Sequence, residues 1–268
     1  MQGLSALFLL HVIAAAGCST TQEARVATES RTSIEAVFKH GPLQPSRASV
    51  AIDDLVRPCG SIATYEVLSG KRKGKRIVQR VSSTLEHTIL EEMLIDETAV
   101  NADSHGQIPA ERMMLERRAD GALLLREVAT HDEDSLSKFA DGLPFAIPIL
   151  TAPTDLEGGS AMQVLTLSAG KARGNGRARR SLRITGEADV EFAGTRARAT
   201  VLELTFDVTL DVAEAHVQST IFVVPGRGIV GEERREEVRI LGIFPRRRDE
   251  TTVLIQLESR TAPNGPTP

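Results

Sequence analysis

The stretch Leu182–Phe192 reads LRITGEADVEF, and its apolar side chains fall on every second position. The stretch Leu202–Val212, LELTFDVTLDV, shows the same alternation, with glutamate, threonine and aspartate between the apolar residues. Successive side chains of a β-strand point to opposite faces, so both stretches predict long strands with one apolar and one charged face. Clean alternation of this kind is typical of antiparallel sheets that are solvated on one side.

Turn signals surround this pair of strands. Asp120-Gly121 and Asn175-Gly176 favour hairpin turns, Pro225–Gly228 favours a third turn, and a fourth is expected over Pro245–Asp249. About ten strands then lie between residues 60 and 260, too many to lie flat in one twisted sheet. The fold class expected is therefore mainly all-β: a large, curved antiparallel sheet that forms a half-barrel or a barrel.

Two segments favour short helices within this fold. Leu85, Ile89 and Met93 recur at helical spacing within residues 84–95, where a strand is the alternative. Ser135–Ala140 is expected to form one helical turn, with Asp134 as its N-cap. The prediction is thus a β fold with one or two short helices.

The N-terminus carries an apolar run, Leu4–Ala16, that ends in small residues before Cys18. The run is too short to span a bilayer, which needs about 20 residues, and it suits the apolar region of a secretory signal. Ala15-Ala16-Gly17-Cys18 resembles the lipobox of bacterial lipoproteins, although alanine stands where leucine is usual and no Lys or Arg precedes the run. This resemblance implies that residues 1–17 are a signal peptide and that Cys18 carries the acyl chains, palmitate among them, of a membrane anchor. An ordinary cleaved signal and an uncleaved apolar start remain alternatives.

Composition divides the rest of the chain. Residues 18–48, rich in Ser, Thr, Ala, Arg and Glu, are expected to be a lipid-anchored tether, and residues 49–260 the antiparallel β domain. Residues 261–268 hold three prolines and are expected to be a disordered tail. Ser19 follows the cysteine, and in lipoproteins of Gram-negative bacteria this favours the outer membrane. The expected location is therefore the bacterial cell envelope, on the periplasmic face of the outer membrane.

The overall composition is that of an ordinary globular protein and excludes some partners. The net charge of −4 argues against nucleic-acid binding, and 3% aromatic residues with no Trp argue against aromatic stacking platforms. The chain has two cysteines, so an acylated Cys18 leaves Cys59 without an intramolecular disulfide partner. We expect Cys59 to be a small buried residue at the entrance of a strand; a reactive thiol and an intermolecular disulfide are the alternatives.

A second resemblance rests on Ile221–Glu233, which reads IFVVPGRGIVGEE. An apolar strand, a Pro-Gly-x-Gly turn followed by Ile-Val, and a charged strand resemble a pattern of bacterial envelope lipoproteins of uncharacterised function. Those proteins are similar in outline to the Lol-type lipoprotein carriers, whose curved half-barrel holds acyl chains. The resemblance covers residues 155–258 and implies a lipid-binding sheet; it carries over no catalytic residue.

Motifs of catalytic chemistry are absent from the sequence. It has no Gly-x-Ser-x-Gly elbow, no His-Glu-x-x-His motif and no Cys-x-x-Cys pair. The acidic cluster His131–Asp134 lacks the alternating ligands of a calcium loop, and we interpret it as a solvated loop. The protein is therefore expected not to be an enzyme, and no cofactor, catalytic residue or metal site is predicted.

Three of the expected turns are strongly basic although the chain as a whole is acidic. Such clusters attract anionic lipid head groups, and charged turns that are merely soluble are the alternative. The candidate contacts to an anionic surface are Lys71, Arg72, Lys73, Lys75, Arg76, Lys171, Arg173, Arg177, Arg179, Arg180, Arg246, Arg247 and Arg248.

The sequence therefore favours a lipid-anchored envelope protein that binds an apolar ligand, a lipid or a partner protein on its curved sheet. A purely structural or assembly lipoprotein with a filled core is the alternative, and an envelope hydrolase without a readable motif is a more distant one. A solvent-reachable apolar cavity of a few hundred Å³ would favour ligand binding, and a filled core would favour the structural role.

Overall fold

The computed structural model describes residues 37–95, 108–240 and 244–259. Almost all of its regular structure is β, and within these ranges no helix is long and apolar enough to cross a membrane. The elements are β1 (Phe38–His40), β2 (Ser49–Ala51), α1 (Ile52–Leu55), β3 (Ser61–Val67), β4 (Arg76–Ser83), β5 (His87–Ile95), β6 (Glu111–Arg117), β7 (Leu123–Thr130), the 3-10 turn η2 (His131–Glu133), β8 (Ser135–Ala146), β9 (Ile149–Thr151), β10 (Asp155–Thr166), β11 (Ala172–Phe192), β12 (Thr195–Leu210), β13 (Ala213–Val224), β14 (Gly228–Ile240) and β15 (Phe244–Ser259).

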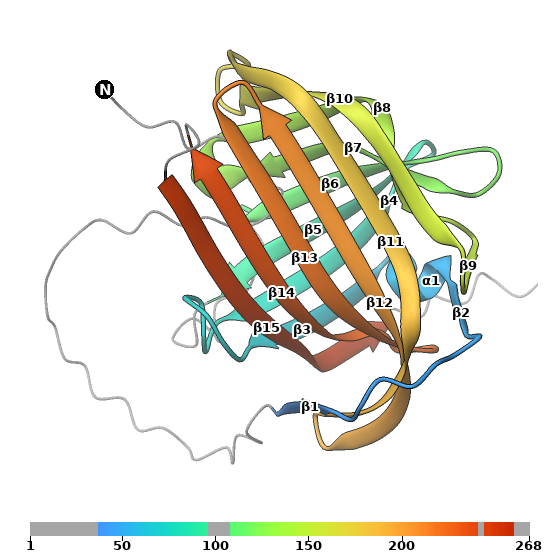
Figure 1. Ribbon diagram of the computed structural model, residues 1–268. Helices are drawn as coiled ribbons and strands as arrows, with labels where there is room; N and C mark the ends of the chain where they lie inside the picture. Colours follow the sequence, from blue (N-terminus) through green and yellow to red (C-terminus); the bar gives the residue numbers. More distant parts are fainter. Residues whose placement is uncertain (1–36, 96–107, 241–243, 260–268) are drawn as a thin grey trace, which may run out of the picture.

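The strands form one antiparallel sheet that closes on itself. Each strand from β3 onward pairs with its neighbour along the chain, with β9 set aside, and β15 returns to pair with β3. The closed ring of the described residues is a barrel of twelve strands, β3–β8 and β10–β15. In Figure 1 the yellow to red strands β11–β15 form one wall and the cyan and green strands form the wall behind them. The predicted all-β, curved antiparallel fold is confirmed, in its closed form.

The connections of this meander alternate between two ends of the barrel. The β3–β4, β7–β8 and β10–β11 turns share one end, here called the basic end because the predicted lysine and arginine clusters begin there. The other end, here called the plugged end, is covered by α1 and by the small sheet β2–β9. Val50 of β2 and Leu150 of β9 are buried against inward side chains such as Leu182, Leu202 and Ile221. The plug therefore completes the apolar core where the ring alone would leave its interior open to water.

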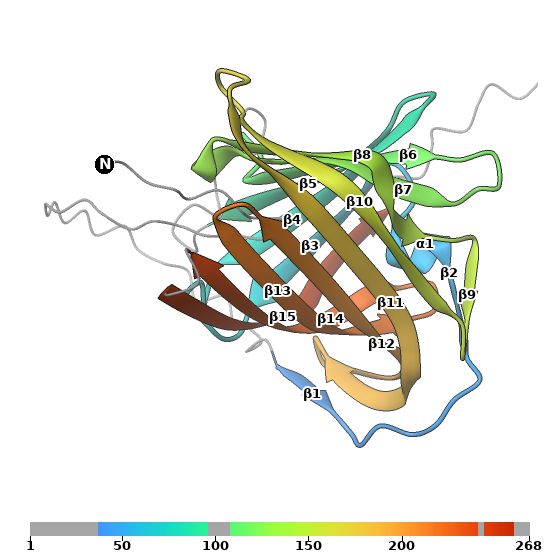
Figure 2. The ribbon, with the colours of Figure 1, turned by 45° about the horizontal axis from the view of Figure 1, so that its top comes forward.

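The long strands β11 and β12 extend beyond the ring and fold over its outer face. A register shift between Ile184 and Gly186 reverses which face the following residues present. β1 pairs with the end of β11, and the Phe38 ring packs edge-on against Phe222, with ring centroids 5.0 Å apart. Phe38 also covers Gly231, where a Cβ would lie 2.4 Å from its ring. Figure 2 shows this hairpin end beside β1, below the barrel.

The packed part of the chain thus begins earlier than the predicted boundary at residue 49. Phe38–His40 are already paired with β11, and Gln44 bridges to Glu187. Cys18, the signal peptide and the first part of the predicted tether lie outside the described residues, as does the tail 261–268.

Two of the four predicted turns are correct. Asp120-Gly121 joins β6 to β7, and Pro225–Arg227 joins β13 to β14. Asn175-Gly176 instead lies within β11, where Gly176 allows a close approach: a Cβ there would meet the Thr209 carbonyl oxygen at 2.0 Å. Pro245–Asp249 lies within β15 rather than in a turn. Both turn predictions were wrong because glycine and proline can also lie within strands, as Gly176 and Pro245 do here.

Both segments in which a short helix is expected form strands, and for residues 87–95 this confirms the alternative to the helix. Residues 87–95 form β5, whose apolar residues lie on both faces: Leu90 faces inward, and Met93 faces the other way. Apolar residues on both faces hide the alternation and imitate a helical period. Ser135–Ala140 belongs to β8, where Ser135 and Ser137 alternate with exposed positions and are themselves buried.

Candidate functional site

The interior of the barrel holds a cavity of about 190 Å³. Its apolar lining comes from α1 and from strands on every side of the ring, so the walls are inward-facing side chains of strands that lie far apart in the sequence. These residues are Leu55, Ile77, Leu90, Met113, Leu125, Phe145, Leu182, Leu204, Phe206, Ile221 and Ile229. The cavity thus has the mainly apolar walls typical of small-molecule sites.

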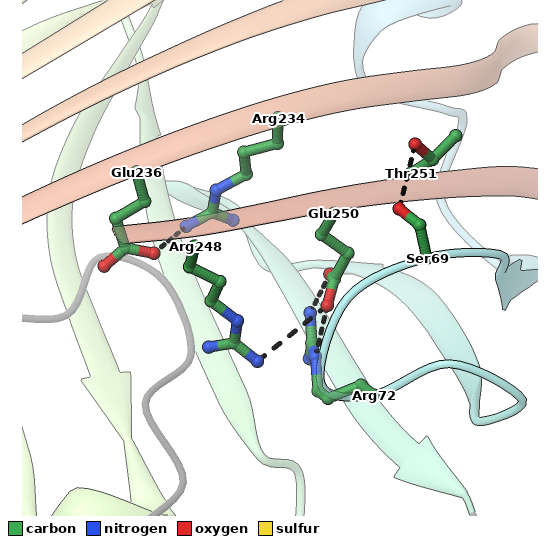
Figure 3. Close-up of polar contacts among 7 residues, drawn as sticks. All are labelled: Ser69, Arg72, Arg234, Glu236, Arg248, Glu250 and Thr251. Carbon is green, nitrogen blue, oxygen red and sulfur yellow. Dashed lines mark hydrogen bonds and ion pairs between the residues drawn. The ribbon is translucent and has the colours of Figure 1, made fainter. Parts of the chain in front are cut away.

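A charged corner lines the cavity where β14 and β15 meet the β3–β4 turn. Arg72 reaches inward from that turn and binds Glu250 through two hydrogen bonds, of which the Nε–Oε2 bond is 2.9 Å long. Both side chains are buried, with exposures of 3% and 7%. Arg248 lies 3.8 Å from the same carboxylate, and Arg234 lies 3.3 Å from Glu236. Figure 3 shows this corner, in which buried Arg72 and half-buried Arg234 and Arg248 each lie close to a carboxylate of the fold.

The pKa shifts in this corner follow from burial. Burial raises the pKa of the Glu236 carboxyl, and the charge and hydrogen bond of Arg234 oppose that rise. Burial also lowers the pKa of the Arg248 guanidinium, as does the nearby Arg72 charge. The corner keeps its charges because cations and carboxylates alternate across it.

An acidic pair on β5 and β6 also lines the lumen, close enough to the charged corner for Arg72 and Arg234 to lower its pKa values. Glu92 on β5 and Glu111 on β6 are directly paired across the two strands. Burial, with the nearby Glu92 charge, raises the pKa of Glu111 to about 8, and burial raises that of Glu92 as well. Gln79 Nε2 donates to Glu92 at 3.3 Å, whereas the buried Glu111 Oε2 has no hydrogen-bond partner within the described part of the chain. At neutral pH Glu111 is therefore mainly protonated and uncharged.

Arg180 is a buried cation on a third wall, on the inward face of β11. Its Nη1 donates to the carbonyl oxygens of Pro144 at 2.6 Å and Phe145 at 2.9 Å, and its guanidinium lies 4.7 Å from the centroid of the Phe145 ring. Among the residues that the structure describes, no carboxylate forms an ion pair with it. Burial lowers the pKa of Arg180 to about 10, so the group is still charged at neutral pH.

The structure divides the thirteen predicted surface cations. Arg72 and Arg180 are buried inside the barrel, with exposures of 2% and 7%, so assigning them to a surface was wrong. For Arg180 the reason is that the second cluster continues into β11, where alternate side chains point inward. Arg72 lies in the β3–β4 turn and is buried because it reaches inward to Glu250. The exposed members are Lys71, Lys73, Lys171, Arg177, Arg179, Arg246 and Arg247, and the half-buried members are Lys75, Arg76, Arg173 and Arg248.

Several of these cations have carboxylate partners of their own. Arg179 contacts Glu157, Arg247 contacts Glu237, and Arg173 contacts Asp134. All three clusters begin at the basic end, so the structure brings the exposed members to one end of the barrel. The predicted contact with an anionic surface stays a prediction.

The other residues singled out in the sequence have local structural settings. Cys59 precedes β3 as predicted but is exposed, so its predicted burial was wrong. Asp134 accepts hydrogen bonds from the backbone N–H and the hydroxyl of Ser168, and so links the β7–β8 turn to the turn after β10. Among the described residues, no group of three or more His, Cys, Asp or Glu side chains is placed to hold a metal ion.

Sequence reasoning missed the acidic pair and the separate position of Arg180. A signal for Arg180 was present, because it continues the every-second-residue series of Leu182 and Ile184. The inward side of Glu92 and Glu111 had no such signal, since nothing in their neighbours indicates the face.

Comparisons with known proteins describe only the outline of the fold. No protein-family model matches the chain, and no curated protein matches it in sequence. A candidate lipoprotein from Parabacteroides distasonis is similar in structure, with 8% identity, a TM-score of 0.41 and coverage of 76% of this chain and 98% of that one. A candidate exported protein from Bacteroides fragilis with a YmcC-like fold has 10% identity, a TM-score of 0.39 and the same coverage.

Proposed function

We propose that this protein is a lipid-anchored protein of the bacterial envelope that binds a small apolar ligand inside its barrel. The observation that supports ligand binding is the cavity, which about eleven apolar side chains line although the plugged end closes one side of the barrel. A cavity lowers stability because the side chains that line it lack packing contacts on one side. A barrel with only a structural role would therefore be more stable with this space filled.

The test uses a neutral ligand and a variant that fills the cavity. Titration of the full chain carrying Cys18→Ser, which has no acyl chains of its own, with 1-octanol should show saturable heat. Leu204→Trp places a large ring in the cavity and should abolish that binding. Thr209→Trp, on the exposed outer face of the same strand, should leave it intact. Absence of octanol binding to the parent chain would favour a structural or assembly role instead.

The anchor is proposed from the lipobox resemblance and is tested separately. Cys18→Ser should move the protein from the membrane fraction to the soluble fraction and abolish incorporation of labelled palmitate. From Cys18 to Phe38 the chain reaches at most about 70 Å when fully extended, enough for the anchor to leave either end of the barrel near the membrane.

Contact of the basic end with anionic lipid is the further part of this proposal. It is supported by the exposed lysines and arginines that lie at one end of the barrel. Each such residue contributes roughly 1 kcal/mol of attraction when it lies near an anionic membrane surface. Four exposed cations form no ion pair with a described carboxylate and are therefore the best candidates for lipid contact: Lys73, Lys171, Arg177 and Arg246. Changing these four to Ser should weaken binding of the Cys18→Ser chain to anionic liposomes, and unchanged binding would contradict this part.

A further inference from the structure

The barrel wall is split between β8 and β10, beside the cavity. The two strands pair from Ser135↔Thr166 to Phe139↔Met162 and no further. Beyond that point the rest of β8 pairs with β7, and the rest of β10 pairs with β11. The carbonyl groups of β8 that face the split therefore need donors from elsewhere.

Side chains bridge the split in place of a backbone ladder. The Asp141 backbone N–H donates to the Ser160 hydroxyl at 3.1 Å, and the Pro144 ring lies against Gly158. Arg180 donates to two further carbonyls of β8, those of Pro144 and Phe145, through one guanidinium nitrogen. Carbonyl oxygens need N–H groups but not a full positive charge, so this role leaves the charge of Arg180 unexplained.

The remaining donors of Arg180 have no partner among the described residues. A guanidinium has five N–H groups, and the two carbonyls use only those of Nη1. Arg57 is also buried without a carboxylate, but Tyr65, Gln79 and two backbone carbonyls accept its hydrogen bonds, and it does not line the cavity. Arg180 does line the cavity, at 7% exposure.

We propose that the ligand of the lumen is a carboxylic acid with a medium-length alkyl chain, whose carboxylate pairs with the free side of Arg180. This inference rests on the proposed function, because it names the ligand class of the same cavity. Buried charges in proteins are normally paired, and a planar guanidinium matches a carboxylate with two parallel hydrogen bonds. The ligand carboxylate would give Arg180 a hydrogen-bonded counter-charge, as Glu250 does for Arg72.

The surroundings of Arg180 fit an amphiphile of this kind. Leu182 follows it on the inward face of β11, and Phe206 lies directly opposite it on β12. Four carboxyls line the same cavity, those of Glu92, Glu111, Glu232 and Glu250, and none of them forms an ion pair with Arg180. Glu250 is bound to Arg72, and burial raises the pKa of Glu92 and that of Glu111, the latter to about 8. A volume of about 190 Å³ holds a chain of about six to eight carbons, if a methylene takes roughly the space of one water.

The test compares octanoate with 1-octanol, which have the same chain and differ in charge. Calorimetry on the full chain carrying Cys18→Ser at pH 7.5, where the acid is ionised, should show octanoate binding about tenfold or more tightly. Arg180→Met should abolish this preference and leave octanol binding in place. Arg180→Lys keeps the positive charge but cannot form two parallel hydrogen bonds to a carboxylate, so it should reduce the preference for octanoate. Arg177 is exposed on the outer face of the same strand, so the control Arg177→Met should leave the affinity for both ligands unchanged.

The outcomes separate this inference from the proposed function. Binding of octanol without any preference for octanoate would overturn the inference and leave the proposed function standing. A preference that survives Arg180→Met would overturn it as well. If neither ligand binds, both fail. If Arg180→Met does not fold, the affinities of the parent chain for octanoate and octanol still test the inference, because equal affinities would overturn it.

Discussion

Two corners of the lumen hold a buried arginine, and they differ in what stands opposite the charge. Arg72 faces Glu250, which accepts two hydrogen bonds from it and lies near Arg248 as well. Arg180 faces two backbone carbonyls and a phenyl ring, and among the described residues no carboxylate pairs with it. The difference teaches that one corner is complete in charge within the fold, although Arg72 Nη1 has no hydrogen-bond partner among the described residues, whereas the Arg180 corner is incomplete in charge there. Each prediction below breaks or sharpens that contrast.

The largest effect is expected when the complete corner is broken. Glu250→Gln leaves Arg72, and in part Arg248, buried without a full counter-charge, which should cost about 3–5 kcal/mol in the free energy of unfolding measured with urea. The double variant Arg72→Met with Glu250→Leu removes both charges and should recover most of that loss. A single variant as stable as the parent would show that the pair is not the source of stability here.

A smaller loss is expected when the incomplete corner is changed. Arg180→Met removes the donors of two carbonyls but orphans no charge, so it should cost about 1–3 kcal/mol by the same urea measurement. A loss equal to that of Glu250→Gln would mean that Arg180 has a hidden counter-charge, and the contrast between the corners would fail.

The acidic pair of Glu92 and Glu111 gives a pH-dependent effect. Burial raises the pKa of Glu111 to about 8, whereas an exposed glutamate titrates near 4.5. The folded state binds more protons between these values, so stability should fall as the pH rises from 4.5 to 8. In melting curves, Glu111→Gln should flatten that decline and melt at a higher temperature than the parent at pH 8.5.

Glu116 is the matched control for this experiment. It is partly exposed, and the hydrogen bond from Arg126 lowers the pKa of its carboxyl, so its contribution is lost only as the pH falls through the acid range. Glu116→Gln should therefore leave the slope between pH 5 and 8 unchanged. A parent chain whose melting temperature does not fall over this range would contradict the assignment of a protonated Glu111.

The smallest effect is expected on the outer face. Arg177 lies three residues before Arg180 on β11 but is exposed. Arg177→Met should change the free energy of unfolding by less than about 0.5 kcal/mol, as surface substitutions usually do. A larger loss would show that the outer charges, too, support the barrel wall.

The sequence predicted the fold better than the site because alternation is visible only where one face is apolar. Leu182–Phe192 and Leu202–Val212 have such faces, and both lie in strands, β11 and β12. β15 and β5 carry charged residues toward the lumen, so the sequence of Arg246–Arg248 predicts a turn, and that of residues 84–95 leaves helix and strand open. A closed barrel makes an inward position identifiable only through the register of strands that lie far apart in the sequence.

The site followed the same limit. Arg177, Arg179 and Arg180 were grouped as one basic cluster, yet the strand places the first two outside and the third inside. The two-residue spacing from Leu182 and Ile184 indicated the inward face of Arg180, but residue type alone grouped it with its exposed neighbours. Neither the split between β8 and β10 nor the pairing of Arg72 with Glu250, 178 positions apart, has a local signal.

The pairing of β15 with β3 has a consequence for how the barrel forms. Ring strands otherwise pair with strands close to them along the chain, whereas this seam joins Ser61–Val67 to Thr252–Ser259 across a loop of roughly 200 residues. Hairpins form in microseconds, and distant pairings are slow because the loop must close before contacts reward it. We expect the closing of this seam to limit the folding rate. An exported chain would then acquire its enclosed lumen only after its last strand has arrived, and until that moment the charged corner between β3 and β15 does not exist.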